Sequence, residues 1–309
     1  MANLLIETIK VARPIHWVKN FAVFAALIFS QNLLNENLFI KVILAFISFS
    51  FATSASYIFN DLLDAKLDRL HPLKRKRPIA ARKLPITLAI IIMFGFALIS
   101  LYLALGLNSL FFFSVSGYLG IQVFYSLILK NIAIIDILII AAGFVLRVYA
   151  GAFVIDAHLS VWFLLCVISV ALFLASGKRR AELNILEYAG ITRKSLIKYQ
   201  RELLNSYVTM FGNAAWMSWA LFTFFESPSA TTPIWLFLAE ISRTTTINKL
   251  LMLTIPIVIF GIMRYENLIF EGKAEAPEKL LLTDVSLITS FFIWLGIIII
   301  ILYGGASAL

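Results

Sequence analysis

Cysteine and histidine are almost absent from this chain, which has one cysteine and three histidines among its 309 residues. Cys166, the single cysteine, lies inside an apolar run and has no second cysteine with which to form an internal disulfide. No Cys/His spacing of the kind that binds zinc is present. These absences exclude a disulfide-stapled or zinc-finger fold, and we interpret Cys166 as a small core residue.

Charged residues are also scarce. Asp, Glu, Lys and Arg make up 14% of the chain, whereas 61% of the residues are hydrophobic and the mean hydropathy is +0.94. A soluble globular domain of this length does not have such a composition. Apolar runs of about 20 residues recur along the whole length, and this is the length that spans a bilayer as a helix. The sequence therefore predicts an all-α polytopic membrane protein, with residues 1–309 forming a single integral membrane domain.

About nine transmembrane helices are expected from the apolar runs. The expected spans are residues 20–34, 38–59, 85–105, 109–129, 132–154, 159–176, a seventh that ends near 225, 249–265 and 285–303. A polar segment, residues 177–202, separates the sixth span from the seventh. Residues 233–240 form a run too short to cross, and we expect them to lie at the membrane interface.

The basic residues indicate orientation. The net charge is +9, but the lysines and arginines are concentrated in a few loops, so nucleic acid is not expected as a partner. All of the 26 basic residues except Lys41, Arg147, Arg243 and Lys249 fall on one side of the expected topology. Because positively charged loops remain in the cytoplasm, we expect a cytoplasmic-membrane protein with its amino terminus inside.

The stretch from residue 60 to residue 83 holds three carboxylates and eight basic residues in an otherwise apolar chain. Asp61, Asp64 and Asp68 are spaced i, i+3 and i+7, which on a helix places them on one face, with Asn60 at its edge. The three aspartates cover roughly 10 Å of helix. This distance suits a magnesium ion shared with a diphosphate. The alternative is a solvated, charged helix end.

The pattern Asn60-Asp61-x-x-Asp64-x-x-x-Asp68 resembles the first aspartate-rich motif of the UbiA superfamily of intramembrane prenyltransferases. The HPxKxxRPIA pattern from His71 to Ala80 resembles the decaprenyl-phosphate phosphoribosyltransferase branch. The resemblance implies a UbiA-like helical bundle with its active site on the cytoplasmic side. It also implies transfer of 5-phosphoribose from phosphoribosyl diphosphate to a polyprenyl phosphate. Asn60 and the three aspartates would be catalytic, with the aspartates holding Mg²⁺.

Basic residues around this motif are expected to hold phosphate groups. Lys74 and Arg77 follow the aspartates directly, and Lys19 lies just before the first expected span. Lysine and arginine both form charge-assisted hydrogen bonds to phosphate oxygens. We therefore predict that all three bind substrate.

A second polar group lies around the connection between the fourth and fifth expected spans. Tyr125 can donate a hydrogen bond to a phosphate, and Lys130 supplies a positive charge. The alternative is an interfacial aromatic residue with a snorkelling lysine. Asp136 lies between two isoleucines at the start of a span, where a carboxylate usually has a partner. We predict that all three residues take part in substrate binding.

The segment from Lys178 to Glu182 departs from the superfamily pattern. Most members that use prenyl diphosphates carry a second aspartate motif, DxxxD, at about this position, whereas this chain has the sequence KRRAE. Basic residues in its place favour a donor with more phosphate groups and less metal bridging. We predict that Lys178, Arg179 and Glu182 bind substrate. The alternative is an ordinary positively charged loop on the cytoplasmic side.

The fifth expected span contains residues with packing consequences. Gly143 and Gly151 would let another helix approach closely. Arg147, between them, either pairs inside the bundle or snorkels to the outer interface, and we expect a structural role. Asp284 precedes the last span, and its role is left open by the sequence.

Two other functions remain open. One is a prenyltransferase of the same fold that joins a prenyl diphosphate to an aromatic acceptor, which the intact first motif permits and the missing DxxxD disfavours. The other is a lipid transporter without enzymatic activity. Transporters place ionisable groups near the bilayer midplane, whereas most charges here cluster at one membrane face. The sequence determines neither the prenyl chain length nor the oligomeric state.

Overall fold

Helices are the regular secondary structure of the described part of the protein, as the sequence predicts. A computed structural model describes residues 2–70, 74–189, 199–226, 245–271, 280 and 282–304, and no strand occurs among them. His71 and Pro72 of the HPxKxxRPIA pattern lie outside this part of the chain, and so does the run at 233–240 that was expected at the interface.

The amino-terminal half begins with short helices and continues with long ones. Its elements are α1 (Ala2–Ala12), η1 (Pro14–Phe24), α2 (Ala25–Phe29), α3 (Glu36–Asp68), η2 (Lys74–Lys76), α4 (Ile86–Leu107), α5 (Ser109–Leu127), η3 (Leu129–Asn131) and α6 (Ile135–Ile155). The carboxyl-terminal half contains α7 (Val161–Ala189), α8 (Arg201–Phe225), η5 (Thr245–Thr254), α10 (Ile255–Phe270) and α12 (Val285–Tyr303).

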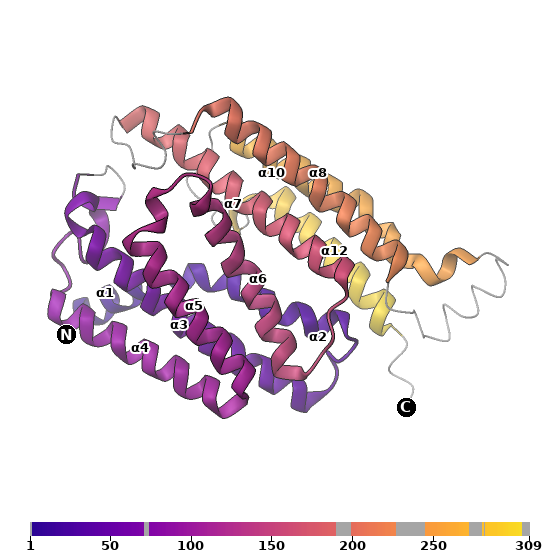
Figure 1. Ribbon diagram of the computed structural model, residues 1–309, viewed down its shortest axis with the longest axis horizontal. Helices are drawn as coiled ribbons and strands as arrows, with labels where there is room; N and C mark the ends of the chain where they lie inside the picture. The colour runs from indigo at the N-terminus through magenta and orange to yellow at the C-terminus, as the bar shows by residue number, and fades with distance from the viewer. Residues whose placement is uncertain are drawn as a thin grey trace.

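The helices form two groups joined through α6. Helices α3, α4 and α5 pack against one another, and α7, α8, α10 and α12 form the second group (Figure 1). Helix α6 contacts both α5 and α7, so it links the two groups. One apolar core lies among α2, α3, α5 and α6, and a second lies among α7, α8, η5 and α12.

Seven of the described helical segments are long and apolar enough to cross a membrane, so this is an integral membrane protein, but a count of nine spans is not confirmed. The first expected span, residues 20–34, corresponds to a shorter apolar segment, Pro14–Phe29. Helix α8 has 25 residues, but it is not among the seven. Large apolar side chains on the outer helix faces are exposed, such as Tyr102 at 77%, which suits contact with lipid.

Helix η1 packs so closely on α6 that their backbones touch at Gly151. An ideal Cβ placed on Gly151 would lie 2.0 Å from the carbonyl oxygen of Val23. This confirms the close approach predicted at Gly151. At Gly143 the nearest atoms lie 3.4 Å or more from such a Cβ, which is ordinary contact.

Gly151→Ala is expected to destabilise the protein. The new methyl group would overlap a backbone atom of η1, and overpacking of this kind costs about 1–3 kcal/mol. The measurement is the Tm of the purified protein in detergent. Gly120→Ala is the matched control because no atom lies within 4 Å of an ideal Cβ there. An equal Tm for the two variants would contradict this account of η1 packing.

Arg147 pairs inside the bundle and does not snorkel. Its side chain donates to the Asn20 side-chain oxygen (2.7 Å), the Gly143 carbonyl (2.6 Å) and the Tyr118 hydroxyl (2.9 Å). Arg147 is only 5% exposed. These bonds join η1, α5 and α6, so the expected structural role agrees with its position.

Candidate functional site

Helix ends from both halves of the chain meet at one end of the molecule. Lys130, in η3, lies 2.6 Å from Asp64 near the end of α3. Arg179, in the last part of α7, lies 2.6 Å from the hydroxyl of Tyr125 on α5 and 2.7 Å from Asp136 on α6. We call residues 60–68, 125–136 and 178–184 the polar end, and it brings together most of the predicted site residues.

The three aspartates lie on the last two turns of α3, so the helix continues beyond the expected end of its span at residue 59. Asp61 is 1% exposed and Asp68 is 4% exposed, while the side chain of Asp64 is 18% exposed. The i, i+3, i+7 spacing therefore places the three aspartates on one face of a helix, as predicted. A solvated, charged helix end does not agree with the burial of Asp61 and Asp68.

Each aspartate has a cationic partner from another part of the chain. Arg77 lies 3.0 Å from Asp61 and 2.6 Å from Asp68. Lys130, itself 6% exposed, contacts Asp64 and also donates to the Asn60 side-chain oxygen at 3.2 Å. Two predicted phosphate-binding residues are thus already paired with the predicted metal ligands.

Arg13 is a further partner that the sequence motifs do not identify. Its Nη2 lies 2.5 Å and 2.6 Å from the two carboxylate oxygens of Asp61. The two residues are 48 positions apart in the chain. Arg13 precedes Pro14 at the junction of α1 and η1, and its only signal in the sequence is its place near the start of the first apolar run.

We call the side of α3 that carries Asp61, Asp64 and Asp68 the aspartate face. Its carboxylates are suitable ligands for a magnesium ion, although they do not converge on a single point. Among the described residues, no three His, Cys, Asp or Glu side chains are grouped so as to hold a metal. Mg²⁺ is commonly bound through only one or two carboxylates together with substrate phosphates. Carboxylate oxygens on one helix face meet that requirement, with Asp64 the most accessible of the three.

Arg179 forms the centre of a buried cluster. It is fully buried, as is Asp136, and its contacts are with Asp136, Tyr125 and Glu182. The partner that the sequence predicted for Asp136 is therefore Arg179. Four predicted substrate-binding residues lie together here and contact one another. The cluster joins the end of α5, the start of α6 and the second half of α7.

Tyr199 extends this cluster and has no signal in the sequence. Its hydroxyl donates to Asp136 at 2.8 Å and accepts a hydrogen bond from the backbone N–H of Ile134. Burial and the Asp136 carboxylate raise the pKa of Tyr199, so the phenol stays protonated at neutral pH. Ile134 has φ 70°, a strained value for a β-branched residue. Tyr199 thus helps to hold the loop that carries Lys130.

The remaining predicted residues lie around these pairs. The ammonium group of Lys19 is 3.5 Å from the hydroxyl of Tyr57, one turn before Asp61. Lys74 is half-buried in η2. Lys178 is half-buried on α7 and has no hydrogen bond or ion pair with any residue that the structure describes.

Asp284 has a structural role in the described part of the chain. Its carboxylate forms an ion pair with Arg264 at 2.7 Å and accepts a hydrogen bond from the backbone N–H of Leu287 at 3.0 Å. The second contact caps the start of α12. The hydrogen bond from Arg264 lowers the pKa of Asp284, so the carboxylate stays ionised at neutral pH. These contacts join α10 to α12.

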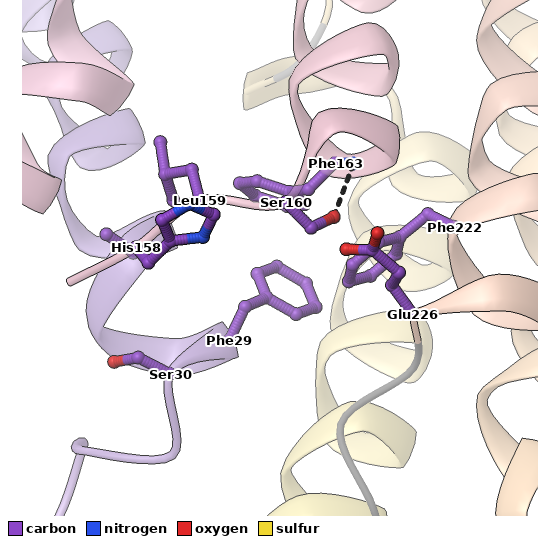
Figure 2. Close-up of a pocket in the computed structure, with 9 residues that line it drawn as sticks. Phe29, Ser30, His158, Leu159, Ser160, Phe163, Phe222 and Glu226 are labelled. Atoms are coloured by element: carbon purple, nitrogen blue, oxygen red, sulfur yellow. Dashed lines mark hydrogen bonds between the residues drawn. The ribbon is translucent and has the colours of Figure 1, made fainter.

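A small cavity lies at the end of the molecule opposite the polar end. Its volume is about 140 Å³, and it is bounded by the end of α2, the connection from α6 to α7 and the end of α8 (Figure 2). Its lining residues are Ala26, Phe29, Ser30, His158, Leu159, Ser160, Phe163, Phe222 and Glu226. It is too small for a polyprenyl chain and is separated from the aspartates, so we do not assign it to the site.

Comparison with known proteins supports the resemblance. The model of the UbiA prenyltransferase family matches residues 20–242. A decaprenyl-phosphate phosphoribosyltransferase from Corynebacterium glutamicum is 35% identical, over 97% of this chain and 88% of the relative. One from Mycolicibacterium smegmatis is 34% identical, over 96% of this chain and 92% of the relative.

A solved structure shows the same fold. It is a UbiA homologue from Archaeoglobus fulgidus bound to GPP and Mg²⁺, and it superposes with a TM-score of 0.65. The match covers 94% of this chain and 96% of the other, at 18% sequence identity. At that identity the likeness concerns the fold alone.

Proposed function

Because the chain belongs to the UbiA prenyltransferase family, we propose that it transfers 5-phosphoribose from phosphoribosyl diphosphate to a polyprenyl phosphate and releases diphosphate. The observation that carries this proposal is the likeness, over 96–97% of the chain, to relatives named decaprenyl-phosphate phosphoribosyltransferase. The polar end supports it, because it combines carboxylates with cationic side chains from several helices. Such a set suits a donor that carries a diphosphate and a separate phosphate.

The donor's diphosphate would bind at the aspartate face. Asp61, Asp64 and Asp68 would hold Mg²⁺, which when bound offsets the charge of the leaving diphosphate. Lys74, Arg77 and Lys130 would bind phosphate oxygens by charge-assisted hydrogen bonds. Their positive charge stabilises the negative charge that grows on the diphosphate as the bond to C1 of the ribose breaks.

The acceptor needs little help from the protein to act as nucleophile. A lipid phosphate is already anionic at neutral pH, so its oxygen attacks C1 without a strong general base. It approaches from the face opposite the departing diphosphate, which inverts the anomeric centre. The polyprenyl chain would lie among the apolar helices, open to lipid. Lys178, which has no ion pair in the described part of the chain, is the cation we assign to an additional phosphate.

A direct comparison of donors tests the proposal. The purified protein is given radiolabelled phosphoribosyl diphosphate with polyprenyl phosphate, and in parallel a prenyl diphosphate with 4-hydroxybenzoate. We expect a labelled lipid only from the first pair, with Mg²⁺ present. Turnover of the second pair alone would replace this proposal with an aromatic prenyltransferase. Turnover of neither pair by folded protein would contradict both.

The active site is proposed to face the cytoplasm, with the amino terminus on the same side. A cysteine at Lys76, exposed in η2, is expected to react with an impermeant thiol reagent only from the cytoplasmic side. A cysteine at Asn37, exposed at the start of α3, is expected to react only from outside. Labelling of intact cells and inverted vesicles measures this. The reverse pattern would contradict the proposed orientation.

A further inference from the structure

Arg13 contacts the two carboxylate oxygens through which Asp61 would bind a metal ion. Its guanidinium contacts both carboxylate oxygens of Asp61, at 2.5 Å and 2.6 Å, and Arg77 lies 3.0 Å from one of them. Asp61 is only 1% exposed. A divalent cation therefore has no open approach to this carboxylate while Arg13 keeps its place.

Each carboxylate of the aspartate face has a cationic counterion within the protein. Three carboxylates meet three cationic side chains: Arg13 and Arg77 at Asp61, Arg77 again at Asp68, and Lys130 at Asp64. Addition of a divalent cation alone would add two positive charges beside these side chains, and such repulsion is strong where water is largely excluded. Addition of a metal together with a diphosphate supplies the negative charge that the displaced cations need.

We propose that Arg13 is the internal counterion of Asp61. Its guanidinium moves from Asp61 to a phosphate of the donor when metal and diphosphate bind together. The inference rests on the proposed function, since it takes the aspartate face to be the site of the metal and the diphosphate. It adds a donor-binding residue from the amino-terminal segment. It also explains how carboxylates that do not converge on a metal can hold one in the loaded enzyme.

Two hydrogen bonds anchor the backbone next to Arg13, so we assign the transfer to its side chain. Ser54 on α3 donates to the carbonyl oxygen of Ala12 at 2.8 Å, and the indole N–H of Trp17 donates to Ser54 at 3.0 Å. Arg13 itself has φ 52°, a left-handed conformation that is uncommon for a residue other than glycine. This conformation ends α1 and begins η1 beside the aspartate face.

A neighbouring ring gives the guanidinium a partner besides the carboxylate. The guanidinium carbon of Arg13 lies 4.9 Å from the centre of the Tyr57 ring, and Tyr57 is one helical turn before Asp61. A cation over an aromatic face is stabilised without any negative charge. The side chain can therefore remain against Tyr57 while its charged end moves from Asp61 to a phosphate oxygen.

The test measures metal binding itself. Mn²⁺ replaces Mg²⁺ as the probe, and its binding to the purified full-length protein in detergent is followed by electron paramagnetic resonance. Titrations are run with and without saturating inorganic diphosphate, each against a protein-free blank. For the unaltered protein we expect at least tenfold tighter Mn²⁺ binding with diphosphate. Equal Mn²⁺ affinity with and without diphosphate would overturn the proposal for Arg13, but it would not contradict a metal site at the aspartates.

Variants identify the residue responsible. Arg13→Gln is expected to bind Mn²⁺ alone at least fivefold more tightly than the unaltered protein, and to gain less from diphosphate. Lys10→Gln is the matched control, because it removes one positive charge from α1 at a residue whose ion pair is with Glu7. Arg13→Lys keeps the charge and is expected to bind Mn²⁺ as the unaltered protein does, so a change seen only in Arg13→Gln is due to the lost positive charge. An unchanged Mn²⁺ affinity in folded Arg13→Gln would overturn the role of Arg13.

Failure of this inference is distinct from failure of the proposed function. If the folded protein binds no Mn²⁺ even with diphosphate, the metal–diphosphate site itself is wrong, and both proposals fall. If Mn²⁺ binds and Asp64→Asn weakens it, but diphosphate has no effect, only the counterion proposal falls.

Discussion

Asp64→Asn is expected to lower kcat/KM by about 10²–10³-fold, which is the usual loss when one electrostatic contact to a developing charge is removed. Asp64 is the most accessible of the three aspartates, and its ion pair is with Lys130. The amide is neutral and a poor ligand for Mg²⁺, so the diphosphate would lose part of its neutralising charge. The measurements are initial rates with phosphoribosyl diphosphate at saturating Mg²⁺, together with the Tm of the variant.

Asp156→Asn is the matched control for this change. Asp156 is exposed at the end of α6, far along that helix from Asp136, and its φ of 52° is one that asparagine tolerates. The substitution Asp156→Asn makes the same chemical change away from the polar end, and we expect no loss of rate. Removal of Mg²⁺ by EDTA should abolish the activity of the unaltered protein, and magnesium should restore it. Full activity of Asp64→Asn would contradict the metal site.

Arg179→Ala is expected to destabilise the protein strongly. Arg179 and Asp136 are both fully buried, and the substitution would leave the Asp136 carboxylate without its cationic partner. Loss of one partner of a buried ion pair costs about 3–5 kcal/mol. We therefore expect a large drop in Tm, together with loss of activity as α5, α6 and α7 lose their common contact. Thermal unfolding in detergent measures the first effect, and initial rates measure the second.

Lys178→Ala separates this structural effect from donor binding. It removes the same charge from the preceding residue, which has no ion pair in the described part of α7 and its surroundings. A charge-assisted contact with the donor is worth about 1.5–3 kcal/mol. We expect a loss in kcat/KM of about 10- to 100-fold, through a higher KM, with an unchanged Tm. If Arg179→Ala instead raised KM and left the Tm unchanged, its guanidinium would be a direct donor contact.

The aspartate face is the part of the site that the sequence predicts best. Helical periodicity alone places Asp61, Asp64 and Asp68 on one side of α3, and the structure confirms that they lie there. Asp136 is a second success, because a buried carboxylate at the start of a span predicts a partner, and Arg179 is that partner. Both predictions depend on local spacing or on the high free energy of an unpaired charge in an apolar environment.

The long-range pairs lie beyond what sequence patterns reveal. Arg13 meets Asp61 across 48 residues, and Tyr199 meets Asp136 across 63. These contacts depend on how η1 and α8 pack on their neighbours, which no local pattern specifies. Hydropathy has a similar limit at residues 20–34, because it measures apolar content and does not show where a helix ends. The helical segment that forms there, Pro14–Phe29, starts earlier and is shorter than the spanning helices.

The most direct measurement of the central claim follows the two ends of the donor separately. Phosphoribosyl diphosphate carries one radioisotope of phosphorus in its 5-phosphate and another in its diphosphate, and it is incubated with the purified protein, Mg²⁺ and polyprenyl phosphate. The account predicts that the 5-phosphate label enters the lipid phase while an equal amount of the other label is released as free diphosphate. It also predicts that neither event occurs without the lipid. Entry of the diphosphate label into the lipid, or release of diphosphate without any labelled lipid, would contradict it.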